Sequence, residues 1–450
     1  MTVAQKLQDD VVAGGICTGC GACVALDPAG RARMVDTPLG PQPDFAGADL
    51  PELAWQVCPG KGVDYAALYH AHYGQLPENW LLGCHQRVRT GHSADETIRR
   101  AGASGGVITH TLIYLLENKL VDAAIVVRQG VPEPLLARAV IARSRAEILA
   151  AAQSVYIPVA TLDLLPQLTP GERYALVCLP DQAAALRQLQ HAGHPAAQQI
   201  KFVLGPYTGT ALYPAAITCF LRSRRVPKND VVTSLKWRAG EWPGYLEIRT
   251  AAGRVLTSKK IYYNFLIPFF ITQNSLQSMD FTNEFCDLSV GDAWSPRFEA
   301  LGGGHSVITT RTPEMEAIIA AMERTGLLKT EPEDAAASLA MHGHMLDFKK
   351  RGSYIRNRLR RRFGRAAPEY GLRPDPLPKS RWAVEFVVSF LFLVGGTRVA
   401  RKILEWIPES VIGPLFNRLR LLWKGWSKPV KRKGLGTLTL TPVSKLGKID

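Results

Sequence analysis

Three cysteines at a spacing of three, Cys17, Cys20 and Cys23, are the feature that most constrains the fold of this chain. They stand in the stretch ICTGCGACVAL, where Gly19 and Gly21 keep the loop between them compact. A tight loop with this spacing can turn three thiolates into one concavity, as ferredoxin-type iron–sulfur loops do. We therefore expect the residues up to about position 73, which are also rich in Pro and Gly, to form a loop-rich segment wrapped around such a group.

A fourth cysteine, Cys58, is followed directly by Pro59, which is typical of ferredoxin-type ligands. Three clustered thiols and a remote Cys-Pro favour one 4Fe–4S cluster held by Cys17, Cys20, Cys23 and Cys58. A structural zinc site more often has two separated C-x2-C pairs; zinc and free thiols stay open as alternatives. The eight cysteines in 450 residues are too few and too uneven for a disulfide framework, so a reducing compartment is expected.

Helix-like and strand-like segments alternate after the cysteine segment. Ser104–Val121 carries apolar residues at helical period, and DAAIVVRQ after it predicts a strand. YALVCLP and IKFVLGPY predict strands on either side of the helix DQAAALRQLQHAG. Residues 230–312 are richer in strand signals, with VVTSLKWR, HSVITTRT and a hairpin in YLEIRTAAGRVLTSKKIYY. We therefore expect an α/β fold of mixed α+β character with some parallel pairing.

The net charge of +15 is concentrated at the C-terminal end. Residues 341–450 hold 24 Lys and Arg against 7 Asp and Glu, whereas the preceding residues hold 30 against 32. In this region PLFNRLRLLWKGW predicts an amphipathic helix whose apolar face comprises Leu415, Phe416, Leu419, Leu422, Trp423 and Trp426. The run WAVEFVVSFLFLVGG is too short to span a bilayer.

Three interpretations of this basic tail compete. It is a peripheral anchor on an anionic membrane surface, an arm that binds nucleic acid, or a packed helical domain with a solvated basic face. We favour the membrane anchor, because a stripe of Leu, Phe and Trp would contribute little against phosphates. No nucleic acid is expected as a partner.

Several stretches in order resemble the coenzyme F-420 hydrogenase/dehydrogenase β-subunit family, which also contains ferredoxin-dependent chlorophyll-pathway reductases. They are CTGCGAC with Cys58-Pro59, IRRAGASGGVITHTLIYLLE, VCLPDQAAALRQL, KWRAGEWPG, DFTNEFCDLSVGDAW and GGGHSVITTRT. The resemblance covers about residues 16–312. It implies FAD bound beside iron–sulfur clusters. It also implies electron transfer between a carrier, either reduced coenzyme F-420 or ferredoxin, and a partner or substrate.

Two glycine-containing motifs and one basic strand are candidates for the flavin site. In ASGGV, Ser104 can cap the following helix while the two glycines let a pyrophosphate approach its first N–H groups; an ordinary N-cap with a tight turn is the alternative. SVGDAW can touch the flavin or form a plain turn, and LKWRAGEW, with Lys236 and Arg238, can face its charge or be a solvated strand. The candidate flavin-binding residues are Ser104, Gly105, Gly106, Thr109, Lys236, Gly291 and Asp292.

The chain departs from its relatives at three positions. Relatives commonly carry cysteines for a second cluster in TPCQ and in a C-x2-C before PDFTNE, where this chain has Asp181, Ser275 and Ser278. Serine is a poor iron ligand and carboxylate a rare one, so only one cluster is expected. Asp181 is the candidate catalytic acid or base. Cys178 is expected to be inert in an apolar strand, while Cys84 and Cys286 stay open as ligands.

These expectations combine into three segments. Residues 1–75 form a small ferredoxin-like iron–sulfur segment, 76–335 a flavin-binding α/β core, and 336–450 a basic, amphipathic helical extension. We expect an FAD- and 4Fe–4S-dependent oxidoreductase that acts on an unknown, apolar substrate. We expect it in the cytoplasm, peripheral to the inner face of the membrane, because neither a signal peptide nor a run of 18 apolar residues is found. A non-catalytic electron-transfer or adaptor subunit, and a degenerate scaffold without flavin, stay open.

Overall fold

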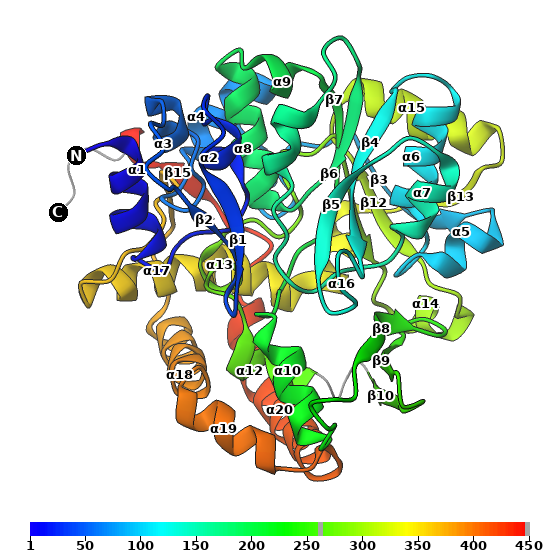
Figure 1. The fold of residues 1–450 in the computed structure, drawn as a ribbon. Coiled ribbons are helices and arrows are strands. Elements are labelled where there is room, and N and C mark those ends of the chain that lie inside the picture. The colour runs from blue at the N-terminus through cyan, green and yellow to red at the C-terminus, as the bar shows by residue number, and fades with distance from the viewer. Residues whose placement is uncertain (260–263, 446–450) are drawn as a thin grey trace.

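The computed structural model of the protein describes residues 1–259 and 264–445 (Figure 1). Its largest element is an eight-stranded mixed sheet. In sheet order, the strands are β13 (Leu328–Pro332), β3 (Arg87–Ser93), β12 (Ser306–Thr310), β11 (Leu288–Asp292), β7 (Ile200–Pro206), β6 (Tyr174–Val177), β4 (Ala123–Gln129) and β5 (Ala137–Ala142). Strands β4, β6, β7 and β11 are parallel, and β12 is antiparallel to both β11 and β3. The carboxyl ends of β3, β11, β7, β6 and β4 therefore share one edge, the carboxyl edge.

Helices cover both faces of this sheet, as alternating apolar side chains require. One face packs against α5 (Glu96–Ala101), α6 (Val107–Glu117), α7 (Arg145–Ala150) and α15 (Pro313–Arg324). The other packs against α4 (Tyr65–Tyr73), α8 (Pro180–His191) and α9 (Pro195–Gln198). In β4, Ala124 and Val126 join the first core, while Ala123 and Ile125 join the second. The predicted α/β class and the predicted helices and strands around β4, β6 and β7 are confirmed.

The segment that carries the four predicted cluster cysteines, which we call the cysteine segment, lies beside α8. It contains only short helices and strands. They are α1 (Val3–Lys6), η1 (Leu7–Val12), α2 (Ala22–Ala25), the hairpin β1 (Arg33–Thr37) and β2 (Gly40–Asp44), and α3 (Glu52–Gln56). Gly19 and Gly21 both have left-handed φ, at 72° and 88°. A Cβ on Gly21 would lie 2.7 Å from the Asp163 backbone nitrogen, so this loop tolerates only glycine there.

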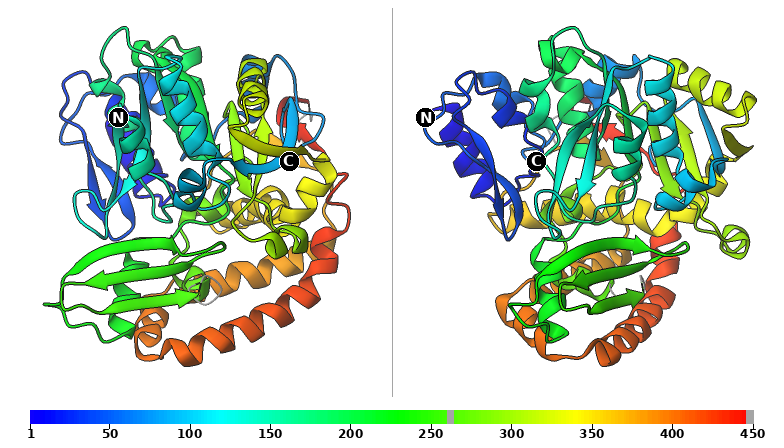
Figure 2. Two further views of the ribbon diagram at one scale, coloured as in Figure 1. Left: turned by 90° about the vertical axis from the view of Figure 1, so that its right-hand side faces the viewer. Right: turned by 45° about the vertical axis from the view of Figure 1, so that its right-hand side comes forward.

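A second, smaller lobe lies beneath the carboxyl edge in all views (Figures 1 and 2). Its three-stranded antiparallel sheet comprises β8 (Val232–Ala239), β9 (Tyr245–Thr250) and β10 (Val255–Lys259). The predicted hairpin about residues 251–253 is confirmed, but its last predicted residues, 260–263, lie outside the described residues. The helices of this lower lobe are α10 (Ala215–Ser223), η3 (Asn264–Leu266), α12 (Ile267–Phe270), α18 (Lys379–Gly395), α19 (Arg398–Trp406) and α20 (Glu409–Arg432).

A continuous run of three helical elements passes between the sheet and the lower lobe. These are α16 (Ala335–Asp347), η4 (Phe348–Gly352) and α17 (Ser353–Arg362). The basic residues of η4 are buried, with Lys349 and Lys350 exposed by only 1% and 2%. The first part of the predicted 336–450 extension is therefore packed into the core, although its basic composition favours a solvated surface. The remaining elements are η2 (Leu162–Gln167), α13 (Gln273–Gln277), α14 (Pro296–Leu301), β14 (Leu372–Pro374), β15 (Leu440–Pro442) and η5 (Val443–Lys445).

Within the described ranges, no individual helix has the length and apolar composition needed to cross a bilayer. Helices α18 and α19 meet that test only when they are counted together, and they are bent by 72° at the break between them.

Candidate functional site

All four predicted cluster cysteines line one cavity of about 380 Å³. Its walls come from η1, the cysteine loop, α2 and the β1–β2 hairpin, and the cavity is lined by Leu7, Val11, Val12, Cys17, Thr18, Gly19, Cys20, Gly21, Ala22, Cys23, Met34, Pro43, Phe45 and Cys58. Burial raises the pKa of all four thiols, that of Cys17 to about 12. The pKa of Cys17, Cys20 and Cys23 is raised further by the charge of Cys58, which shows how close the remote cysteine lies. The structure thus brings the predicted set together.

The donor set of this cysteine cavity fits a multi-iron cluster. Four soft sulfur ligands in an apolar surround suit iron–sulfur chemistry. Within residues 1–259 and 264–445, no group of three or more His, Cys, Asp or Glu side chains is placed to hold a metal ion, so the chemistry of the donors is what supports the cluster.

A second cavity, of about 670 Å³, lies directly beside the first, and Cys17 and Thr18 line both. Its lining includes Asp181, Ser275 and Ser278, the three positions at which the family resemblance leads us to expect further cysteines. Those positions come from the N-terminus of α8 and from α13 and its end, about 95 residues apart in sequence. The structure therefore places Asp181, Ser275 and Ser278 around one cavity next to the predicted cluster. We call it the polar cavity.

Charged groups that the sequence did not single out also line this polar cavity. Lys349 of η4 and Asp280 both contribute to it, together with Thr272, Gln273 and Asn274. The Lys349 ammonium donates a 2.8 Å hydrogen bond to the Ser275 carbonyl. Burial, followed by the charge of Arg356, lowers the pKa of Lys349 to about 7. Lys349 stands in a basic run that resembles a solvated surface, so no local sequence signal marks it.

The two carboxyl groups of the polar cavity are held in different ways. Burial raises the pKa of Asp181, and the nearby Thr18 hydroxyl, Asn274 and Lys349 partly offset that rise. Burial and the neighbouring Glu284 charge raise the pKa of Asp280 to about 7. The Asp280 carboxylate accepts hydrogen bonds of 2.8 Å from the backbone N–H groups of Asn283 and Glu284. Asp280 is therefore fixed, whereas Asp181 faces the cavity from a helix N-terminus.

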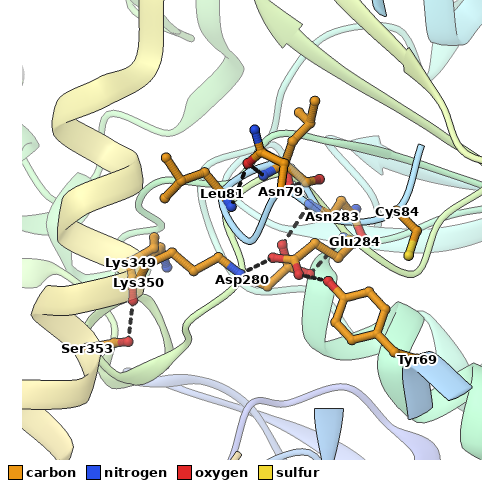
Figure 3. A network of polar contacts seen from close by, with 12 residues as sticks. Tyr69, Asn79, Leu81, Cys84, Asp280, Asn283, Glu284, Lys349, Lys350 and Ser353 are labelled. Atoms are coloured by element: carbon orange, nitrogen blue, oxygen red, sulfur yellow. Dashed lines mark hydrogen bonds and ion pairs between the residues drawn. The ribbon is translucent and has the colours of Figure 1, made fainter. Parts of the chain in front are cut away.

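A fully buried ion pair supports the wall behind Asp280 (Figure 3). The Lys350 ammonium pairs with the Glu284 carboxylate, and neither side chain is exposed. The Tyr69 hydroxyl also donates to Glu284 (Figure 3). These contacts link α4, η4 and the DFTNE segment, so they hold the cavity wall rigid.

The predicted glycine-rich helix start lies at the carboxyl edge, but its cap differs from the prediction. The N-cap of α6 is Gly106, with a left-handed φ of 72° and no side-chain cap, so the prediction that Ser104 caps the helix is wrong. The Ser104 hydroxyl instead donates to the His305 carbonyl and lies 2.9 Å from the Ser306 hydroxyl. A Cβ on Gly105 would lie 2.7 Å from the Gly91 carbonyl oxygen, so the packing of this loop against β3 already requires the glycine.

The N-terminus of α6 still fits a phosphate. An α-helix leaves its first N–H groups without intrahelical partners, and here no side chain caps them. Thr109 lies in this first turn and is 9% exposed. A pyrophosphate would accept from these N–H groups at the carboxyl edge, where ligands of open α/β sheets bind.

The other predicted flavin residues lie at the same edge with different surroundings. Asp292 ends β11 and pairs with Ser306, which also contacts Ser104 and Gly105. The Asp292 carboxylate forms an ion pair of 3.0 Å with the buried Arg238 of β8. The Tyr207 ring lies behind Gly291, where a Cβ would come within 2.4 Å of it. Lys236 is exposed on β8.

The remaining cysteines lie outside both cavities. Cys178 and Cys286 are buried side by side, and the contact with Cys178 helps raise the pKa of Cys286. The Cys84 thiol lies 3.9 Å from the Gln75 carbonyl oxygen. The buried Cys219 thiol lies 3.9 Å from the Arg401 carbonyl oxygen, and none of these four cysteines lines the cysteine cavity or the polar cavity.

The fold is shared with a chain of a solved redox complex, the F-420-reducing [NiFe] hydrogenase of Methanosarcina barkeri. The two chains superimpose with a TM-score of 0.52 and 19% identity, over 65% of this chain and 98% of the other. The sequence matches the N-terminal domain of the coenzyme F-420 hydrogenase/dehydrogenase β-subunit over residues 88–166 and its C-terminal domain over residues 171–336. These matches span more than half of the chain, which therefore belongs to that family of redox proteins, as the resemblance predicted.

Two relatives also match in sequence. One is the coenzyme F-420 hydrogenase subunit β of Methanothermobacter thermautotrophicus, 23% identical over 56% of this chain and 86% of the relative. The other is the coenzyme F-420-dependent sulfite reductase of Methanocaldococcus jannaschii, 27% identical over 70% of this chain. The chain spans about half of that second relative, at 47% of its length. The cysteine segment and α17–α20 lie outside the two matched domains.

Proposed function

We propose that this protein is an iron–sulfur flavoprotein oxidoreductase with one 4Fe–4S cluster, FAD and a substrate site in the polar cavity. The observation that carries the proposal is the shared wall of the two cavities, because Cys17 and Thr18 line both. A group held by the four cysteines would therefore lie next to a molecule in the polar cavity. Such proximity suits electron transfer between the two.

Cys17, Cys20, Cys23 and Cys58 would hold the cluster, and the N-terminus of α6 with Asp292 would hold FAD. Bound FAD would supply the exchange between one-electron and two-electron steps. The chain itself provides uncapped N–H groups for a pyrophosphate and apolar walls that keep water from the cysteines. Arg238 fixes the Asp292 carboxylate at the carboxyl edge.

The polar cavity supports a polar substrate better than the apolar one predicted from the tail. Lys349 and Asn274 offer donors, Asp181 offers an acceptor or a proton, and Ser278 offers both, whereas the Ser275 hydroxyl already accepts from the Ala211 N–H and contacts the Thr272 hydroxyl. Asp181 is the residue we assign to proton transfer, because Asp280 is held by two backbone N–H groups. Coenzyme F-420 is the carrier favoured by the family, with ferredoxin as the second choice.

Anaerobic purification with iron, sulfide and flavin assays tests the cofactors. About four iron and one FAD per chain are expected. Turnover with reduced coenzyme F-420 or reduced ferredoxin, against a set of polar acceptors, then tests the activity. Asp181→Asn should lower kcat at least tenfold with iron and FAD unchanged, while Asp122→Asn, which lies just before β4 and outside both cavities, should leave kcat within twofold. Equal rates for Asp181→Asn and the parent would overturn the catalytic role.

A further inference from the structure

The three C-terminal helices of the lower lobe each carry an exposed apolar stripe. The exposed side chains are Phe386, Phe390, Leu391, Leu393 and Val394 on α18, Val399, Ile403 and Trp406 on α19, and Val411, Leu415, Leu419, Leu421, Leu422 and Trp426 on α20. Their exposed fractions run from 46% to 80%. We call this set the apolar face. Such extensive exposure of large apolar side chains is unusual for a free protein surface and marks an interaction site.

The stripes follow helical period, so the exposure is systematic. On α20, positions 411, 415, 419, 422 and 426 repeat every three or four residues. Positions 399, 403 and 406 do the same on α19. The opposite sides of these helices pack inside the lobe, for example through Leu404 and Val388, which are 2% and 8% exposed. Each helix is therefore folded against the protein on one side, while the large apolar side chains on its other side are left exposed by the residues that the structure describes.

The charge around the apolar face is of one sign. The exposed ionisable side chains from position 379 to 433 are all basic: Lys379, Arg398, Lys402, Arg418, Lys424, Lys428, Arg432 and Lys433. The three glutamates of this segment, Glu385, Glu405 and Glu409, are buried or half-buried. Glu385 pairs with Arg356 and Arg381, and Glu405 pairs with Arg222. An occupant of this face must therefore be apolar and anionic together.

We propose that the apolar face inserts into one leaflet of an anionic membrane, with α18, α19 and α20 lying in the interfacial plane. An amphipathic helix with Trp and Leu on one side and Lys or Arg at its flanks has this binding mode. Trp406 and Trp426, 80% and 66% exposed, carry the ring type that concentrates at the headgroup level. The 72° bend between α18 and α19 keeps this pair from forming one straight membrane span.

Flotation of the full chain with lipid vesicles tests this proposal without any measurement of turnover, so its failure would leave the proposed oxidoreductase activity untouched. The chain should float with vesicles containing 30% phosphatidylglycerol and float poorly with phosphatidylcholine alone. Replacing one exposed residue per helix, in Phe390→Ser/Ile403→Ser/Leu422→Ser, should weaken binding to anionic vesicles at least tenfold. Since these side chains are exposed, the fold should be retained, which circular dichroism checks.

A matched control replaces equally exposed apolar residues elsewhere, in Val231→Ser/Leu301→Ser/Phe363→Ser, and should float like the parent. A charge variant, Lys402→Gln/Lys424→Gln/Lys428→Gln, should lose about fivefold in affinity per residue on anionic vesicles only. Equal flotation of the apolar-face variant and the control would overturn the proposal. A second outcome would also overturn it: the parent chain does not bind vesicles but forms an oligomer in analytical ultracentrifugation, and the apolar-face variant is monomeric. The apolar face would then join copies of the chain.

Discussion

Arg238 of β8 forms an ion pair of 3.0 Å with Asp292 at the end of β11. The Arg238 guanidinium also donates to the Pro243 carbonyl, and its side chain is only 3% exposed. This pair joins the three-stranded sheet of the lower lobe to the carboxyl edge. A second contact, from the Trp237 indole N–H to the Gln129 amide oxygen at 3.1 Å, supports the same junction.

Arg238→Gln should loosen the three-stranded sheet. Removing one partner of a buried pair leaves the other charge uncompensated, at a cost of about 3 kcal/mol or more. Amide hydrogen exchange in β8–β10 should accelerate roughly a hundredfold, because local opening free energy sets protection. Arg249→Gln is the control, since Arg249 pairs with Glu247 in the same sheet with a 53% exposed side chain. Equal exchange in both variants would show that the pair does not hold the sheet.

Cys58→Ser should abolish the predicted cluster. Cys58 supplies the remote fourth thiol of the cysteine cavity, and a hydroxyl is a poor iron ligand. Iron should fall from about four per chain to below one, with loss of the broad visible absorption of the cluster. Cys84→Ser should keep its iron, because Cys84 lies outside both cavities. Full iron content in Cys58→Ser would remove Cys58 from the ligand set.

Restoring three thiols should allow the polar cavity to bind iron. Asp181, Ser275 and Ser278 line one cavity, so Asp181→Cys/Ser275→Cys/Ser278→Cys places three sulfur atoms around it. After anaerobic reconstitution, iron and sulfide should rise above the parent by about three or four per chain. Ser338→Cys, added to the parent as a buried position outside the cavity, should give no such rise. No gain in the triple variant would mean that the cavity cannot hold a second cluster.

Local patterns explain which parts were predictable. The cysteine loop follows from ligand spacing within seven residues, and α6 and β4 follow from hydrophobic period. The predicted cap of α6 is wrong because the Ser104 hydroxyl forms a hydrogen bond with the Ser306 hydroxyl instead, and Ser306 is 202 residues away in sequence. A capping rule that uses only neighbouring residues cannot predict this contact with a distant strand.

The burial of the basic residues of η4 could not be predicted for a related reason. A cluster of Lys and Arg is usually solvated, but Lys350 meets Glu284, 66 residues earlier, in the protein interior. Lys349 likewise reaches the Ser275 carbonyl. The charged residues that complete the polar cavity therefore come together only when distant segments fold against each other. Asp181, Ser275 and Ser278 were instead visible in the sequence, as differences from the family pattern.

His342 should make the fold sensitive to acid. It lies against the Tyr207 and Phe281 rings, both with centroids 5.3 Å from its own. Burial lowers its pKa to about 4, below the unfolded value of about 6.5. Between these two values the unfolded chain binds a proton that the folded chain does not, so stability falls as pH falls from 6.5 to 4.

Urea unfolding at pH 7 and pH 4.5 measures this effect. His342→Gln should lose less unfolding free energy than the parent between these pH values, by up to about 3 kcal/mol. His70→Gln, at an exposed position of α4, should follow the parent. A His342→Gln profile parallel to the parent would show that another group governs the acid sensitivity.

The buried pair of Lys350 and Glu284 gives the sharpest stability prediction. Both side chains are fully buried, so Lys350→Met leaves the Glu284 carboxylate without its partner ammonium. The expected loss is about 3–5 kcal/mol of unfolding free energy, whereas the double variant Lys350→Met/Glu284→Gln should recover much of it, because desolvation of the pair offsets most of its attraction. The midpoints of urea unfolding for the parent, both single variants and the double variant measure this coupling. A double variant no more stable than Lys350→Met would mean that the Tyr69 hydroxyl needs the Glu284 charge itself.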